Sequence, residues 1–97
     1  MKPLKPSMRE KKRYLFIKGE NLQEKILETI QEFLGVLGLA ETGLKFIKLN
    51  KNSAEISINR ESLNKVRASF ALTKEYINVQ NVSGTLKALR TKTNHKT

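Results

Sequence analysis

The spacing of hydrophobic residues switches repeatedly between two periods along this chain of 97 residues. Residues 12–18 are rich in β-forming side chains, residues 22–37 place apolar residues three or four apart, and residues 54–60 alternate between apolar and polar. A period of two is typical of a strand, and a period near 3.6 is typical of a helix. The series predicts strands over residues 12–18, 44–50, 54–60 and 76–82, helices over 22–37 and 61–72, and a short last helix opened by residues 83–85.

This order of elements matches the split βαβ plan, in which two helices pack on one face of a four-stranded antiparallel sheet. We therefore predict an α+β fold, a ferredoxin-like or RRM-like βαββαβ two-layer sandwich with an extra C-terminal helix. Residues 44–50 carry apolar side chains at both odd and even positions, which indicates a sheet covered on both faces, with the last helix as the second cover. Asn21 and Glu24 resemble a capping box at the start of the first helix.

Positive charge is concentrated at the two ends of the chain. The formal net charge is +10, of which residues 1–13 supply +5 and residues 87–97 supply +4. Basic ends suit a polyanion, because neutralising phosphates releases counterions, although such charges can also serve only to keep a small protein soluble. We predict a disordered basic arm over residues 1–10, one domain over 11–91 and a disordered basic tail over 92–97.

The composition disfavours catalysis by this chain alone. There is no Cys or Asp, and the one His, His95, lies three residues from the C-terminus. Glu24, Glu28 and Glu32 follow one helix ridge, which is more typical of a solvated face than of a metal site. We expect no catalytic residue, no metal site and no cofactor bound by the chain. The absence of a long apolar run and of a signal-peptide pattern predicts a cytoplasmic protein without a membrane contact.

Several residues are candidates for contact with RNA. Residues 83–85 place hydroxyls and backbone N–H groups at a helix start followed by basic residues, a combination that suits a phosphate; the alternative is a plain Ser83 cap. Arg67 flanks an apolar stripe, so its stem either packs on the core or reaches a ligand. Base stacking on Tyr14 and Phe16 is disfavoured, because residues 54–60 offer no aromatic side chain. The candidate RNA-binding residues are Lys11, Lys12, Arg13, Arg67, Ser83, Gly84, Lys87 and Arg90.

An apolar stretch interrupted by glycines follows the first predicted helix pattern. Val36, Leu39 and Ala40 lie in it, and they either close the core or form a contact with another subunit. Gly35, Gly38 and Gly43 are expected to break the helical pattern here.

Three segments resemble one known family. MREKKRYLFIK (residues 8–18), RESLNKVRASFAL (60–72) and VSGTLKALR (82–90) are similar to the ribonuclease P protein component 2 family. The resemblance implies a small α/β sandwich subunit of the ribonucleoprotein that removes 5′ leaders from precursor tRNA. In that particle the RNA carries the catalysis with Mg²⁺, and this kind of subunit works with a larger barrel-fold protein.

The function predicted from these features is a non-catalytic subunit that binds and stabilises ribonuclease P RNA. Its expected partners are that RNA, precursor tRNA indirectly, the barrel-fold subunit and, through the apolar stretch, a second copy of the chain. One alternative is a generic basic RNA-binding protein associated with the ribosome. Another is a small ferredoxin-like phosphatase, but residues 18–23 (KGENLQ) lack the arginine that an acylphosphatase carries in its phosphate loop.

Overall fold

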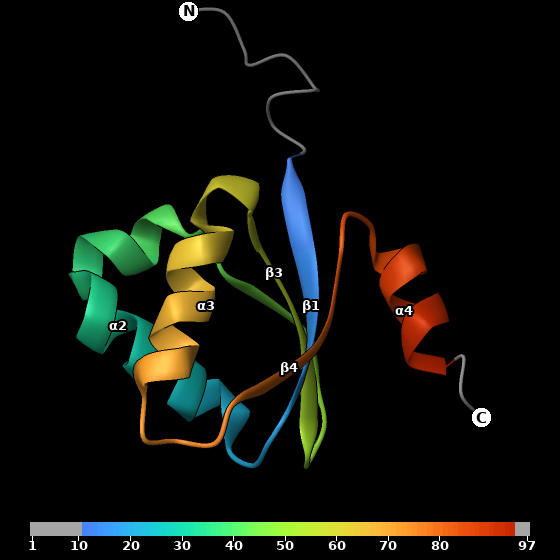
Figure 1. Ribbon diagram of the computed structural model, residues 1–97, viewed down its shortest axis with the longest axis horizontal. Helices are drawn as coiled ribbons and strands as arrows, with labels where there is room; N and C mark the ends of the chain where they lie inside the picture. Colours follow the sequence, from blue (N-terminus) through green and yellow to red (C-terminus); the bar gives the residue numbers. More distant parts are fainter. Residues whose placement is uncertain (1–10, 95–97) are drawn as a thin grey trace, which may run out of the picture.

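The computed structural model describes residues 11–94, with only the backbone described for residues 92–94. The predicted elements are present in the predicted order (Figure 1). They are β1 (Lys12–Lys18), α2 (Leu22–Glu41), β2 (Lys45–Leu49), β3 (Ser53–Asn59), the 3₁₀ turn η1 (Arg60–Ser62), α3 (Leu63–Leu72), β4 (Asn78–Ser83) and α4 (Leu86–Asn94). The predicted arm over residues 1–10 lies outside the described residues, as do residues 95–97 of the predicted tail. Residues 92–94 of that tail lie in α4.

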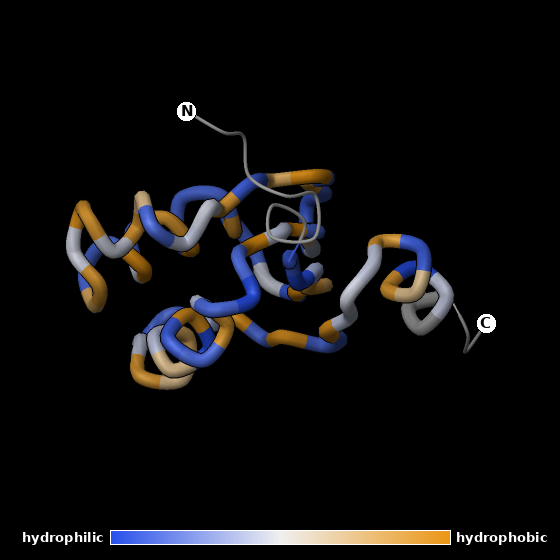
Figure 2. Tube along the Cα trace, turned by 90° about the horizontal axis from the view of Figure 1, so that it is seen from above, coloured by the Kyte–Doolittle hydropathy of each residue, from blue (hydrophilic) through white to orange (hydrophobic). Residues whose placement is uncertain are grey.

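The four strands form one antiparallel sheet in the order β2-β3-β1-β4. This is the order expected for the ferredoxin-like plan, so the predicted fold class is confirmed. Helices α2 and α3 lie on one face of the sheet and α4 lies on the other (Figure 1), and the view from above shows the same separation (Figure 2). The sandwich therefore has a third, partial layer made by the C-terminal helix.

The main core lies between the sheet and the two helices α2 and α3. Leu15 and Ile17 of β1 and Ile56 and Ile58 of β3 are fully buried there. Full burial of an aliphatic side chain stabilises a fold by about 1.5–3 kcal/mol, so this layer supplies most of the stability. The helices complete the core with Leu22, Ile26, Ile30, Val66 and Phe70.

Helix α2 differs from the prediction at both its start and its middle. Asn21 adopts a left-handed conformation (φ 57°) and makes no side-chain capping bond, so the predicted capping box is wrong. Gly35 has a positive φ (φ 80°, ψ 174°) and kinks the helix, as expected, but Gly38 lies inside the helix, which continues to Glu41. A glycine at residue 35 is required because side-chain-bearing residues rarely adopt this backbone conformation.

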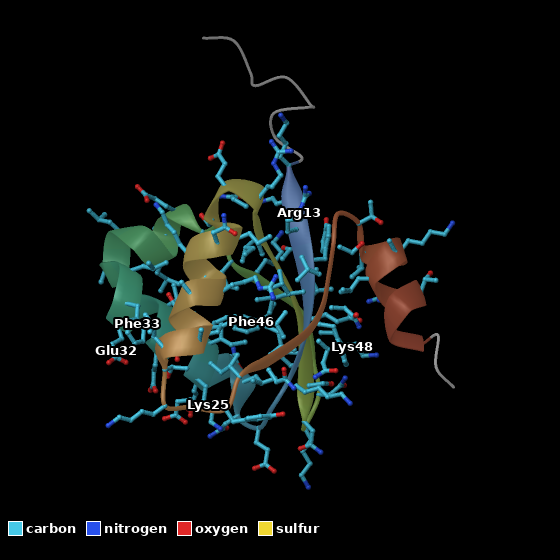
Figure 3. All side chains as sticks on the ribbon, viewed as in Figure 1. Arg13, Lys25, Glu32, Phe33, Phe46 and Lys48 are labelled. Carbon is cyan, nitrogen blue, oxygen red and sulfur yellow. The ribbon has the colours of Figure 1, made fainter. Side chains whose placement is uncertain are left out.

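A β-bulge in β2 explains its apolar pattern. Phe46 pairs with Ile56 while Lys48 pairs with Glu55, so Ile47 is an extra residue in the ladder. The bulge places Phe46 on the side of α2 and α3 and Lys48 on the side of α4, as Figure 3 shows. The predicted second cover is present, since α4 lies on the other face of the sheet, but over β2 the apolar pattern comes from the bulge.

Candidate nucleic-acid interface

The start of β1 lies beside the junction between β4 and α4. Arg13 donates from Nη1 to the carbonyl oxygen of Lys12 at 3.0 Å, and a Cβ placed on Gly84 would lie 3.5 Å from the same Nη1. Lys12 donates from Nζ to Oδ1 of Asn59 at 2.8 Å. Two of the predicted cations, Lys12 and Arg13, are thus held by local hydrogen bonds, and Arg13 points to the predicted glycine.

The cap of α4 is Thr85 rather than Ser83. The Oγ1 of Thr85 accepts a hydrogen bond from the backbone N–H of Ala88 at 3.1 Å, which is typical of an N-cap. Ser83 is the last residue of β4, pairs with Tyr14 and is buried, so the alternative of a Ser83 cap is wrong. Gly84 is exposed between the two, and the first-turn N–H groups of α4 begin at Leu86, two residues after it.

Helix α4 is fixed to the sheet by one apolar and one ionic contact. Leu89 is fully buried, and α4 packs on β4 and β1. Arg90 donates from Nη2 to Oε1 of Glu55 at 3.0 Å and from Nε to both carboxylate oxygens at 3.3 Å. These hydrogen bonds, together with the charge of Glu55, raise the pKa of Arg90. The predicted RNA ligand Arg90 therefore also holds α4 in place.

The remaining predicted RNA ligands divide between two sides of the molecule. Lys11 precedes β1 and Lys87 lies in the first turn of α4, and both are exposed close to the junction described above. Arg67 is exposed on α3, which lies on the opposite face of the sheet (Figure 1). Its stem does not lie buried on the core, and a single flat RNA contact cannot include it together with Gly84.

An exposed apolar patch, made by Phe33, Val36 and Leu37, lies on the second half of α2. It shares only Val36 with the predicted protein contact of Val36, Leu39 and Ala40. Val36 and Leu37 are 66% and 80% exposed, while Leu39 packs partly against the core and Ala40 is exposed. The orange segments at the outer part of α2 in Figure 2 mark this hydrophobic surface, and Figure 3 shows Phe33 there. The sequence analysis named Val36 but missed the two residues that border it.

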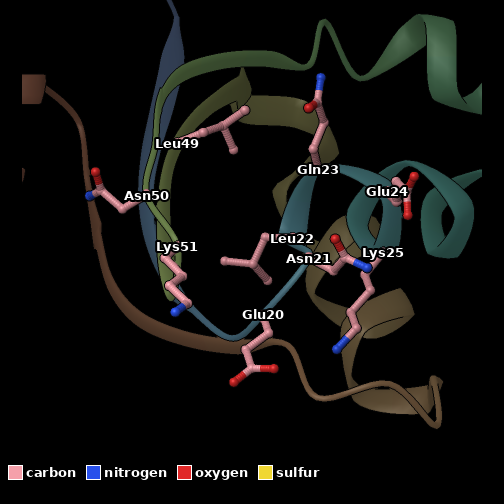
Figure 4. A pocket seen from close by; sticks show the side chains of 9 residues that line it. All are labelled: Glu20, Asn21, Leu22, Gln23, Glu24, Lys25, Leu49, Asn50 and Lys51. Atoms are coloured by element: carbon pink, nitrogen blue, oxygen red, sulfur yellow. The ribbon is translucent and has the colours of Figure 1, made fainter.

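A cavity of about 570 Å³ lies at the β1–α2 corner, where an acylphosphatase would bind its phosphate. Its nine lining residues come from the loop before α2, the first turn of α2, the end of β2 and the turn that follows β2 (Figure 4). The lining holds two carboxylates, Glu20 and Glu24, two lysines, Lys25 and Lys51, and no arginine of the kind that a phosphate loop needs. This geometry argues against the phosphatase alternative.

Within the described part of the chain, no group of three or more His, Cys, Asp or Glu residues is arranged to hold a metal ion. Nor does any described helix have the length and apolar character needed to cross a membrane.

Charge is distributed unequally between the sheet with α4 and the layer formed by α2, η1 and α3. The four strands and α4 contain eight basic residues and one acid, whereas α2, η1 and α3 contain four basic residues and five acids. The first set consists of Lys12, Arg13, Lys18, Lys45, Lys48, Lys87, Arg90, Lys92 and Glu55. Sequence analysis missed the lysines of β2, because their common face depends on the bulge.

A small α+β sandwich whose strands and terminal helix carry most of its basic residues is typical of an accessory protein that binds nucleic acid. The model of the Rpp14/Pop5 family matches residues 5–94, and this chain belongs to that family. Ribonuclease P protein component 2 of Methanococcus maripaludis strain C5 is 31% identical over 98% of this chain and 84% of its own length. The proteins of the same name from strains C6 and C7 are each 28% identical over the same shares. These similarities confirm the family resemblance carried by the three sequence segments.

Proposed function

We propose that this chain is a non-catalytic protein subunit of ribonuclease P that binds and stabilises the catalytic RNA during removal of 5′ leaders from precursor tRNA. The observation that carries the proposal is the uneven charge: eight basic residues and one acid in the strands and α4. Phosphate groups are recognised by such clusters, and release of their counterions drives the binding. Family membership supports the choice of ribonuclease P RNA as the polyanion.

The RNA contact is centred on the junction between β1 and α4. Arg13 lies beside Gly84, and Lys87 follows in the first turn of α4. Backbone N–H groups at a helix start and nearby cations together suit a phosphate oxygen. Lys11 and Lys12 add charge at the start of β1, and Arg90, paired with Glu55, holds α4 beside them.

Catalysis belongs to the RNA in this proposal. Mg²⁺ is held by the RNA rather than by this chain, whose role is to stabilise the RNA fold and, through it, the contact with precursor tRNA. The exposed patch of Phe33, Val36 and Leu37 supports a protein contact on the side away from α4, because large exposed apolar side chains mark interaction surfaces. A larger barrel-fold subunit is the partner we assign to this patch, with a second copy of the chain as the competing occupant. We place the particle in the cytoplasm.

Filter binding to ribonuclease P RNA transcribed from the same genome tests this proposal. With about five phosphates engaged, the affinity should fall roughly a hundredfold between 50 and 200 mM salt. The triple variant Lys12→Gln, Arg13→Gln, Lys87→Gln should bind more weakly and with a flatter salt response. The matched control Arg60→Gln, Lys65→Gln, Lys74→Gln removes the same charge from exposed positions outside the strands and α4 and should bind almost as wild type does.

The same RNA should then be assayed for cleavage of precursor tRNA, with the other protein subunits present. The wild-type chain is expected to increase leader removal, and the triple variant is expected to do so only at higher protein concentration. A flat salt response of the wild type, or equal cleavage with and without the chain, would contradict the proposal. Recovery of ribosomal RNA with the tagged protein would instead support the ribosome-associated alternative.

A further inference from the structure

The bulge in β2 creates a second group of lysines on the face of the sheet that carries α4. Lys45 pairs with Ser57 and Lys48 pairs with Glu55, so both lysines lie on the face opposite to the main core. In a regular strand, residues three apart point to opposite faces, and the two lysines would then be separated. Here the extra residue Ile47 restores them to one face, about 7 Å apart along the strand.

The regular strand β1 adds a third lysine to this face. Lys18 pairs with Ser53, which is two residues from Glu55 on the same side of β3. We call Lys18, Lys45 and Lys48 the lysine surface. All three are exposed, and within the described residues none of the three forms an ion pair.

Glu55 is the one acid among the described residues of the strands and α4, and its carboxylate already has a partner. Both carboxylate oxygens of Glu55 accept hydrogen bonds from Arg90, and its side chain is only 10% exposed. Lys48, the cross-strand neighbour of Glu55, therefore keeps its charge available to an external anion. Helix α4 packs mainly on β4 and β1, which leaves the β2 edge of this face open.

The lysine surface is continuous with the site at the β1–α4 junction. Lys12 pairs with Asn59, and Asn59 is two residues from Ser57, the partner of Lys45. Cations therefore follow one another on this face, from Lys12 at the start of β1 to Lys45 and Lys48 on β2. Figure 3 shows Lys48 on the same side of the sheet as α4. Such a line of charge follows a ribose-phosphate backbone better than it follows a compact anion.

We propose that Lys18, Lys45 and Lys48 form a second phosphate-binding surface, which lets the RNA backbone continue from the β1–α4 junction across the open half of the sheet. This inference rests on the proposed function, since it takes structured RNA as the ligand. A different role for lysines on an edge strand is protection against strand pairing with another molecule.

The test uses the double variant Lys45→Gln, Lys48→Gln and the matched control Lys65→Gln, Lys74→Gln, titrated with in vitro transcribed ribonuclease P RNA at 50 and 200 mM salt. Loss of two phosphate contacts should lower the salt slope by about 1.4–1.8. The affinity loss caused by the double variant should consequently be about tenfold larger at 50 mM than at 200 mM salt. The control pair should keep the wild-type slope, and both variants should keep the wild-type melting temperature.

Each result decides between the two proposals. A wild-type slope for the double variant, with or without increased aggregation, would overturn the lysine surface while leaving the function of the chain in place. An equal loss for the control pair would also overturn it, because only overall charge would then matter. Wild-type protein that binds this RNA no better than an unrelated transcript of equal length would overturn the proposed function itself.

Discussion

Helix α4 depends on Leu89 for its position on the sheet, and the substitution Leu89→Ala tests that dependence. Leu89 is fully buried, whereas Leu86 is partly exposed, so removal of the Leu89 side chain takes away the main apolar contact of the helix. Leu→Ala substitutions at buried sites cost about 2–5 kcal/mol. Helix α4 has nine residues, and helices this short are not stable in isolation. Once α4 detaches, it also unfolds, so the decrease in the free energy of unfolding cannot exceed the free energy with which α4 docks on the sheet.

The expected decrease in the free energy of unfolding is therefore at the low end, about 2–3 kcal/mol. For a domain of this size, that decrease corresponds to a melting temperature lower by roughly 10–20 °C. Urea unfolding followed by circular dichroism gives the free energy, and hydrogen exchange should show faster exchange in α4 than in β1. Leu72→Ala is the control: Leu72 is 69% exposed, and its substitution should change stability by less than about 0.5 kcal/mol. A Leu89→Ala protein as stable as wild type, with α4 still protected, would refute the arrangement described above.

Further predictions concern the ends and turns of the helices. Thr85→Ala removes the cap of α4 and should cost about 1 kcal/mol in urea unfolding, with increased exchange confined to α4; equal protection would reject the cap. Gly35→Ala places a Cβ where nothing lies within 4 Å, so its cost of about 2 kcal/mol should come from backbone strain alone, and an unchanged melting temperature would contradict this. Val36→Asp should leave the melting temperature unchanged and reduce co-purification of the larger protein subunit; undiminished co-purification would exclude the patch as its contact.

The strands and helices were predictable because their hydrophobic periods are strong and local. The alternation of residues 54–60 and the helical spacing after residue 22 predicted the core residues Ile56, Ile58, Ile26 and Ile30 correctly. Element boundaries were less accurate: β4 begins at Asn78 rather than residue 76, and β3 ends at Asn59 because Arg60 starts the turn η1. Such differences arise at the ends of elements, where tertiary contacts as well as the local pattern decide which residue is the last.

The features of the site that the sequence did not reveal depend on tertiary contacts between separate elements. Lys45 and Lys48 share a face only because β2 is bulged against β3, and the linear pattern of β2 does not specify which residue is extra. The pairing of Arg90 with Glu55 joins residues 35 apart in the chain, which no local signal identifies. The cap of α4 was misplaced by two residues, since Ser83 and Thr85 are both suitable capping types and only the end of β4 distinguishes them.

The central claim is that the RNA contacts the side of the molecule that carries α4, and hydroxyl-radical cleavage from a tethered iron chelate tests it most directly. The chain contains no cysteine, so a single substitution gives a unique point of attachment. Ala88→Cys on α4 and Ala68→Cys on α3 are matched, since both residues are exposed helical alanines on opposite faces of the sheet. Cleavage of ribonuclease P RNA at defined nucleotides from residue 88, with little or none from residue 68, is the predicted result. Strong cleavage from residue 68 alone would contradict the account.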